Sequence, residues 1–472
     1  MRWWPDRRSS MALVALVAFA AVGLGVRAAT RESPPPPSSS SSSSSASAPA
    51  APPVGPVGRA GITVYDDGQP LAGRSVVFHG RDGRVLSSTT SGPDGKASGE
   101  VEEGGMITVA YGTSVRRLIT FTSVEPGDAI LVGEKDDDEA NAGASVAEAT
   151  VQLPGPHAGA ARYGVSLGVG VTDVADSARA VAMPVLRRYV TRGNEFATLG
   201  LAFDAKGTAL AYAFGWTKLG ARGGDGGNDR DGGSAIATKL SAWREDWREH
   251  VVVLANAPNG LSTVDAALAI VAGEDRFECG RQQTRIAGGA ATLHFRVPKP
   301  LGTTALVRLE LGADAATGDK IVHFARPKAI ALETRLDLAT LLVPRVTNAK
   351  VERGSSLARP IVRWDEAGGA SAKPTAAIVQ LAWPETKEHL WTIVAPHLAS
   401  ASHRIEVPAL PPSLASWAPD ARPVAVAVAL VAATEYGSWT DVETKGIHLL
   451  SEPPEDDDAT VTIATTGGDL VF

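Results

Sequence analysis

Apolar and polar residues alternate in short segments along most of the chain that follows residue 60. Ile62 and Val64 lie two positions apart, and so do Val76 and Phe78. This period of two places one set of side chains on one face of a strand. Asp-Gly and Gly-Gly pairs separate the segments and supply the positive φ that tight hairpins require. The pattern therefore predicts many short antiparallel strands.

The same alternation continues through the middle of the chain. Residues 196–216 predict a hairpin with its turn at 204–207. Further strands are predicted at 250–255, 291–297 and 305–311. A large number of glycines and few methionines fit strands joined by tight turns better than a helical bundle.

One short segment, residues 241–250, predicts a helix. Trp243 and Trp247 are four residues apart, which places them on one helical face. The predicted fold class is all-β nonetheless: tandem Ig-like or fibronectin-like β-sandwich modules, which follow an N-terminal signal or anchor helix and a disordered Pro/Ser linker.

The first thirty residues predict export. Arg2, Arg7 and Arg8 precede an unbroken apolar run over 11–26, which is followed by a small-residue cleavage site at 26–28. The alternative is an uncleaved signal anchor that holds the chain at the membrane through this helix. We expect a periplasmic, outer-surface or secreted protein, whose Pro/Ser-rich tract can bury nothing and acts as a tether.

Two segments resemble known β-sandwich modules. Residues 64–76, and then the threonines and Asp-Gly turn of 89–95, resemble bacterial Ig-like and carboxypeptidase-regulatory-like modules. Residues 360–364, with their tryptophan, and residues 424–438 resemble strands of a fibronectin type III domain. Both resemblances imply spacer, adhesive or binding modules, and neither carries over a catalytic residue.

These features divide the chain into eight parts. In order, they are a signal peptide or signal anchor (1–30), a disordered Pro/Ser-rich linker (31–58), an Ig-like or carboxypeptidase-regulatory-like sandwich (59–133), an acidic linker (134–147), a β domain with a polar Gly/Asp loop at 220–234 (148–240), a second β domain (241–342), a fibronectin type III-like sandwich (343–450) and an acidic tail (451–472).

Charge and cysteine content exclude several classes of function. The net charge is −7 and no basic stripe is present, so a nucleic-acid partner is not expected. Cys279 is the single cysteine, which excludes an internal disulfide and a thiolate zinc cluster.

One candidate nucleophile is present, at Ser166. Residues 164–168 match G-x-S-x-G, in which a sharp turn between a strand and a helix exposes the serine oxygen. The residues that follow continue a strand pattern, which favours a glycine-rich strand. A secreted hydrolase with its site in 148–335 is the competing hypothesis.

Two groups of residues raise the question of metal binding. Asp225, Asp229 and Asp231 lie in a glycine-rich loop and offer oxygen ligands to calcium, but no bidentate glutamate follows, which favours a solvated loop. His389, His397 and His403 lie close together, with Glu385, Glu388 and Glu406 nearby. Zinc needs such donors to converge on one point, and the alternative is a set of solvated turn histidines. No cofactor is expected.

Five of the ten tryptophans lie in the last module. Most are expected in its core. Trp417, in a proline-flanked loop, and Trp439, after a Gly-Ser pair, are the two predicted to be exposed, where they could stack on sugar rings.

We therefore expect a non-catalytic exported envelope or surface protein that binds an envelope protein or polysaccharide through its modules. A structural subunit of an envelope assembly is the third hypothesis, which a large exposed apolar patch would favour.

Overall fold

A computed structural model describes most of the chain beyond residue 55. The described residues are 56–66, 69–112, 115–133, 145–167, 172–174, 180–186, 190, 194–205, 208–219, 235–272, 275–299, 304–312, 319–326, 332–368, 371–383, 388–400, 402–419, 424–446 and 459–466. The leader at 1–30 lies outside them. Among the residues described, no helix is long and apolar enough to cross a membrane.

Strands dominate the described part of the chain, as the alternation predicts. The helical segments described there are short: α2 (Leu338–Leu341), η2 (Pro412–Trp417) and α3 (Trp439–Lys445). The helix predicted over 241–250 is wrong, because strand β16 begins at Trp247. The Trp247 indole N–H donates to the Leu210 carbonyl at 3.1 Å, and the ring meets Tyr212 edge-on, so neighbouring β structure holds this side chain.

The first unit is a sandwich of two sheets. Ile62, Val64, Val76 and Phe78 are buried between the sheets, as their alternation predicts. One sheet has the order β2-β1-β5 with β8 paired parallel to β1, and the other contains β4-β3-β6-β7. The strands are β1 (Val57–Asp66), β2 (Gln69–Pro70), β3 (Ser75–His79), β4 (Val85–Thr90), β5 (Lys96–Glu102), β6 (Gly105–Tyr111), β7 (Val115–Val124) and β8 (Ala129–Val132).

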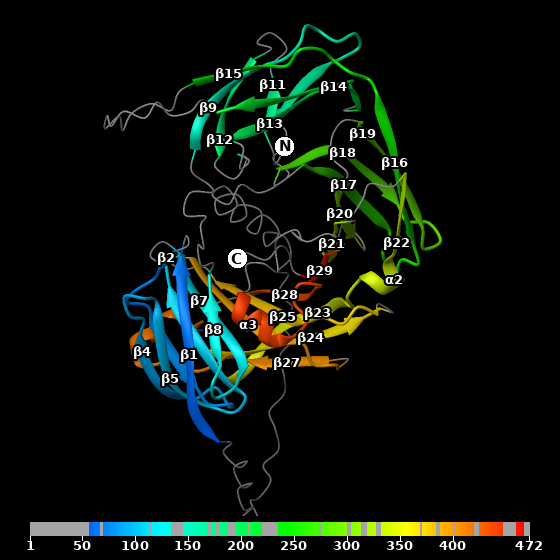
Figure 1. Ribbon diagram of the computed structural model, residues 1–472. Coiled ribbons are helices and arrows are strands. Elements are labelled where there is room, and N and C mark those ends of the chain that lie inside the picture. Colours follow the sequence, from blue (N-terminus) through cyan, green and yellow to red (C-terminus); the bar gives the residue numbers. More distant parts are fainter. Residues whose placement is uncertain are drawn as a thin grey trace, which may run out of the picture.

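The second unit has two sheets of its own, at the top of Figure 1. Their orders are β11-β10-β13-β14 and β12-β9-β15, and they enclose a separate apolar core. The predicted hairpin at 196–216 is formed by β13 and β14. The strands are β9 (Ser145–Gln152), β10 (Arg162–Ser166), β11 (Thr172–Val174), β12 (Ala180–Leu186), β13 (Glu195–Phe203), β14 (Ala209–Lys218) and β15 (Ala235–Lys239).

The third unit packs the sheet β19-β16-β22 beside strands β18-β17-β20-β21. The three strands predicted between 250 and 311 correspond to β16, β19 and β20. The strands are β16 (Trp247–Ala255), β17 (Thr263–Ala272), β18 (Asp275–Arg285), β19 (Ala291–Pro298), β20 (Thr304–Gly312), β21 (Lys320–Ala325) and β22 (Glu333–Asp337).

The fourth unit packs the sheet β23-β24-β27 beside strands β28-β25-β26. Its last strand, β29, comes from the segment that the sequence analysis assigns to the acidic tail. The strands are β23 (Arg345–Ser356), β24 (Arg359–Ala367), β25 (Ala376–Trp383), β26 (Glu388–Pro396), β27 (Ser402–Glu406), β28 (Ala425–Ala433) and β29 (Thr460–Thr466).

A single twelve-stranded sheet joins the first, third and fourth units. Its order is β18-β17-β20-β21-β29-β28-β25-β26-β7-β6-β3-β4. Strand β29 links the third and fourth units by pairing with both β21 and β28. Strand β7 of the first unit pairs parallel to β26 of the fourth, from Val115 opposite Glu388 to Phe121 opposite Val394. Figure 1 shows the blue first unit against the orange strands of the fourth. The units are thus joined by backbone hydrogen bonds.

Gly99 allows the two sheets of the first unit to approach closely. A Cβ at this position in β5 would collide with the ring of Phe78, which is fully buried. We expect Gly99→Ala to lower the free energy of unfolding by about 1–3 kcal/mol, because the core has no room to absorb the added carbon. Gly61→Ala is the matched control on the paired strand, since its nearest neighbours lie 3.8 Å away. Equal denaturant midpoints for the two variants would contradict this account.

Candidate functional site

Ser166 is the last residue of β10 and is fully buried. It pairs with Leu199 of β13, and the chain returns in the antiparallel strand β11. The strand-turn-helix setting of a nucleophile elbow is therefore not formed at this serine. A hydroxyl enclosed within a sandwich cannot reach a substrate carbonyl, so Ser166 is not placed for attack.

Trp417 lies where the first and fourth units meet. It ends η2, is partly buried, and packs on the apolar core of the fourth unit. The Arg116 guanidinium from β7 lies 5.6 Å from the ring centre and donates to the Ser416 carbonyl at 3.1 Å. One face of Trp417 thus receives a cation from the neighbouring unit.

Trp439 is also partly buried, at the start of α3, where it packs against the core shared by the first and fourth units. Among the tryptophans in the described part of the chain, Trp216 on β14 is the most exposed, at 48%. Its position in a predicted hairpin gave no signal of exposure, because an aromatic residue in a strand usually faces the core. Asp225, Asp229 and Asp231 lie outside the described residues.

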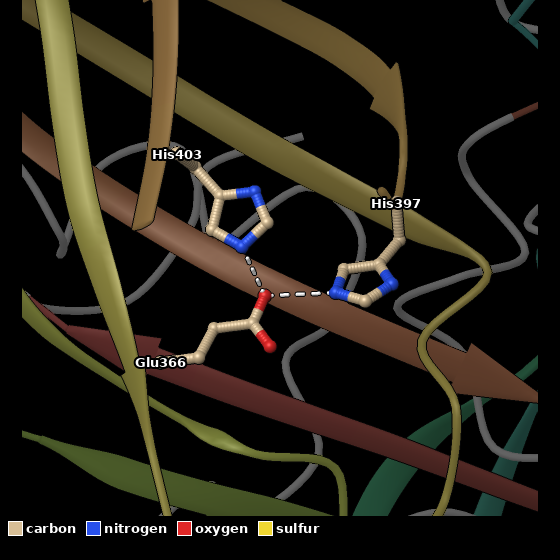
Figure 2. Close-up of side chains that lie close together, drawn as sticks. All are labelled: Glu366, His397 and His403. Carbon is tan, nitrogen blue, oxygen red and sulfur yellow. Dashed lines mark hydrogen bonds and ion pairs between the residues drawn. The ribbon is translucent and has the colours of Figure 1, made fainter. Parts of the chain in front are cut away.

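Three side chains converge between two sheets of the fourth unit (Figure 2). Glu366 near the end of β24, His403 on β27 and His397 just after β26 direct their polar atoms toward one point. Glu366 Oε1 accepts a hydrogen bond from His397 Nε2 at 2.8 Å. His403 Nε2 lies 2.6 Å from the same oxygen, off the angle of a hydrogen bond. The donor atoms of all three residues lie within 4.8 Å of one another.

Strand register explains how this cluster forms. Trp364 lies opposite His403 in the antiparallel pair of β24 and β27, so their side chains share one face. Glu366, two residues after Trp364, projects from that same face. The His403 ring stacks on buried Trp364, with ring centres 4.9 Å apart and planes at 8°. His397 approaches from the other sheet and completes the group.

A second carboxylate lies beside the cluster. Asp365 accepts hydrogen bonds from Ser402 Oγ at 2.6 Å and from Asn348 Nδ2 at 2.9 Å. These two donors hold the pKa of Asp365 below its usual value. Asp365 is therefore ionised at neutral pH and adds negative potential next to the cluster.

Two of the three members of this cluster could be predicted from the sequence. His397 and His403 are among the predicted zinc ligands, and among the described side chains their carboxylate partner is Glu366 and not Glu406. Glu385 and the side chain of Glu388 lie outside the described residues. His389 lies elsewhere, buried with its ring tilted on Trp383. The carboxylate was missed because Glu366 is more than thirty residues from His397 in sequence, and pairing of strands brings it close.

Comparisons with known proteins leave the family open. No protein-family model matches the chain, and no curated protein matches it. Among solved structures, the Bacillus anthracis TIE protein is similar, with 8% identity and a TM-score of 0.14 over 60% of this chain and 51% of that one. This chain therefore spans about half of the TIE protein's length.

Two further solved structures are similar at the same level. They are the central fibronectin-III array of RIM-binding protein, with 10% identity over 58% of this chain and 83% of that one, and a streptococcal ancillary pilin, with 11% identity over 55% and 86%. The TM-score is 0.14 for each. Such scores lie far below those of a shared overall arrangement, so these proteins give no guide to the function of this chain.

Proposed function

We propose that the chain is a non-catalytic exported protein of the cell envelope or surface, which binds a protein or polysaccharide partner through Ig-like and fibronectin-like sandwich modules. The burial of Ser166 carries the non-catalytic part of this proposal, because the one nucleophile motif of the sequence is enclosed in a strand pair. The leader and the Pro/Ser tether support export. The continuous sheet supports a rigid display of surfaces.

Exposed aromatic side chains favour a polysaccharide as the partner. Trp216 is half exposed and meets Phe214 edge-on, with ring centres 5.9 Å apart. An indole face held in this way can stack on a sugar ring. Trp417 and Trp439 offer smaller faces, at the contact between the first and fourth units.

The test is capture from envelope extracts with the secreted form of the chain, run beside a glycan array and a serine-directed activity probe. We expect one protein or polysaccharide partner and no labelling by the probe. Alanine variants of Trp216, Trp417 and Trp439 then locate the surface, and Trp216→Ala is expected to reduce glycan binding most. Probe labelling that disappears in Ser166→Ala would overturn the proposal and identify a hydrolase.

A further inference from the structure

We propose that Glu366, His397 and His403 form a binding site for one divalent transition-metal ion, with Zn²⁺ as the ion that fits best. The inference does not depend on the proposed function, since a metal site is compatible with any partner. It rests on the identity of the donors, on their convergence and on the charge that surrounds them.

The donor set is one that Zn²⁺ prefers. Two imidazole nitrogens and one carboxylate oxygen are common ligands of this ion in proteins, and a fourth position is left for water or a further ligand. Both histidines present Nε2 to the cluster, so both rings have the correct nitrogen turned toward the shared point. The stacking of His403 on Trp364 fixes one ring before any ion arrives.

The distances allow an ion to enter with small movements. Tetrahedral bonds of about 2.0–2.1 Å place neighbouring donor atoms roughly 3.3 Å apart. The two Nε2 atoms lie 2.8 Å and 2.6 Å from Glu366 Oε1. His397 therefore needs to retreat by about 0.5 Å from the carboxylate and His403 by about 0.7 Å, changes that side-chain torsions can supply.

The charge around the cluster favours a cation. The side chain of Glu366 is 11% exposed, and those of His397 and His403 are 11% and 8% exposed. Among the described residues, the ion-pair partners of Glu366 are these two histidines, with no lysine or arginine. A buried carboxylate needs a positive partner. With neutral imidazoles, an ionised Glu366 carboxylate carries a negative charge that a divalent ion would neutralise.

Protonation of one histidine is the rival way to neutralise Glu366. In that case the cluster is a structural ion pair and binds no metal. The two accounts differ in a measurable way, because an imidazole Nε2 that binds the ion cannot carry a proton, so metal binding displaces the proton that the ion pair would hold.

The experiment is calorimetric titration of Zn²⁺ into the untagged secreted form of the chain, after dialysis against a chelator. We expect one ion per chain, and a visible absorption spectrum typical of tetrahedral nitrogen and oxygen ligation when Co²⁺ replaces Zn²⁺. Glu366→Gln, His397→Gln and His403→Gln are each expected to weaken binding at least tenfold. Far-UV circular dichroism verifies that each variant is folded.

His294→Gln is the matched control. His294 also contacts a glutamate, with Nδ1 3.1 Å from Glu249 Oε1, but this pair is exposed and has no third donor assigned to it. We expect this variant to keep full Zn²⁺ binding. A folded wild-type chain that binds no Zn²⁺ at neutral pH would overturn the proposal, and so would binding that the three cluster variants leave unchanged. Failure of this test leaves the binding-scaffold function untouched, because that function is read by partner capture.

Discussion

Trp391→Ala is expected to lower the free energy of unfolding by about 3–5 kcal/mol, as large-to-small changes at buried tryptophans do. Trp391 is fully buried on β26, within the parallel pairing with β7, where it lies opposite Leu118. Its indole N–H donates to Thr120 Oγ1 of β7 at 2.8 Å. The substitution removes both the packing of the ring and this bond across the boundary between the first and fourth units.

The bond begins a buried chain of polar groups. Thr120 Oγ1 lies 2.8 Å from Thr108 Oγ1, which lies 2.9 Å from His79 Nε2. Because an indole nitrogen can only donate, Thr120 Oγ1 accepts from Trp391, and the two threonine hydroxyls connect this bond to His79 Nε2. Burial lowers the pKa of His79 to about 3, with a contribution from nearby Arg359, so this imidazole is neutral and can accept.

Differential scanning calorimetry tests the effect and locates it. The unfolding transition of the units joined by the twelve-stranded sheet is expected to fall in temperature in Trp391→Ala, while the second unit, which keeps a core of its own, shifts less. Trp391→Phe retains most of the ring and loses the hydrogen bond, so we expect a smaller loss of about 1–2 kcal/mol. Trp216→Ala, at a half-exposed ring, serves as the control. A uniform shift of all transitions would argue against the localised role of Trp391.

Local strand structure could be predicted from the sequence because alternation reports on burial directly. Ile62 and Val64 lie on either side of a threonine, and both are buried. The hairpin of β13 and β14 was found because an apolar run stands on each side of a turn. These signals lie within a few residues of one another, which is the range over which periodicity carries information.

The joining of units could not be predicted in this way. Strands β7 and β26 pair through residues separated by more than two hundred and fifty positions, and neither segment differs in pattern from an ordinary strand. Parallel pairing between remote segments leaves no turn signal to read. The contact of Trp417 with the first unit could not be predicted for the same reason, since Arg116 reaches this ring from β7.

The candidate metal cluster could be predicted only in part, for the same reason. Two histidines six positions apart drew attention, and the carboxylate that completes the cluster belongs to a different strand. The helix predicted at 241–250 shows the opposite error. The spacing of the two tryptophans predicts one helical face. In the structure, Trp243 stacks on Tyr163 with ring centres 5.6 Å apart, and Trp247 begins strand β16. Tertiary contacts overrode a weak local signal.

Glu443→Gln is expected to stabilise the chain above neutral pH by on the order of 2 kcal/mol. Glu443 is on α3, which packs on β8 of the first unit, and its side chain is buried with Oε1 lacking a hydrogen-bond partner. Burial raises its pKa to about 7, and the nearby carboxylates of Asp128 and Glu125 add to the shift. The ionised form is therefore disfavoured in the folded chain.

The sign of the pH effect follows from proton binding. Between the ordinary glutamate pKa and about 7, the folded chain holds a proton on Glu443 that the unfolded chain has lost. Stability from this group is present at low pH and is lost as the pH rises to about 7. Glutamine keeps the shape and has no charge to bury. The variant and the wild type should thus have similar stability near pH 4.5 and diverge as the pH increases.

Chemical denaturation at several pH values between about 5 and 8 measures this divergence. The range runs from just above the ordinary glutamate pKa to just above the raised pKa of Glu443. His79 and His323 also affect stability in acid, because burial lowers their pKa values to about 3 and about 4. Both histidines are unchanged in the variant, so their contribution cancels in the difference between variant and wild type. Glu100→Gln, at an exposed position of β5, is the control and should show no divergence. The stability difference between Glu443→Gln and wild type could instead stay constant with pH. That result would mean that Glu443 is ionised in the folded chain, and that the contact of α3 with β8 accommodates a buried negative charge.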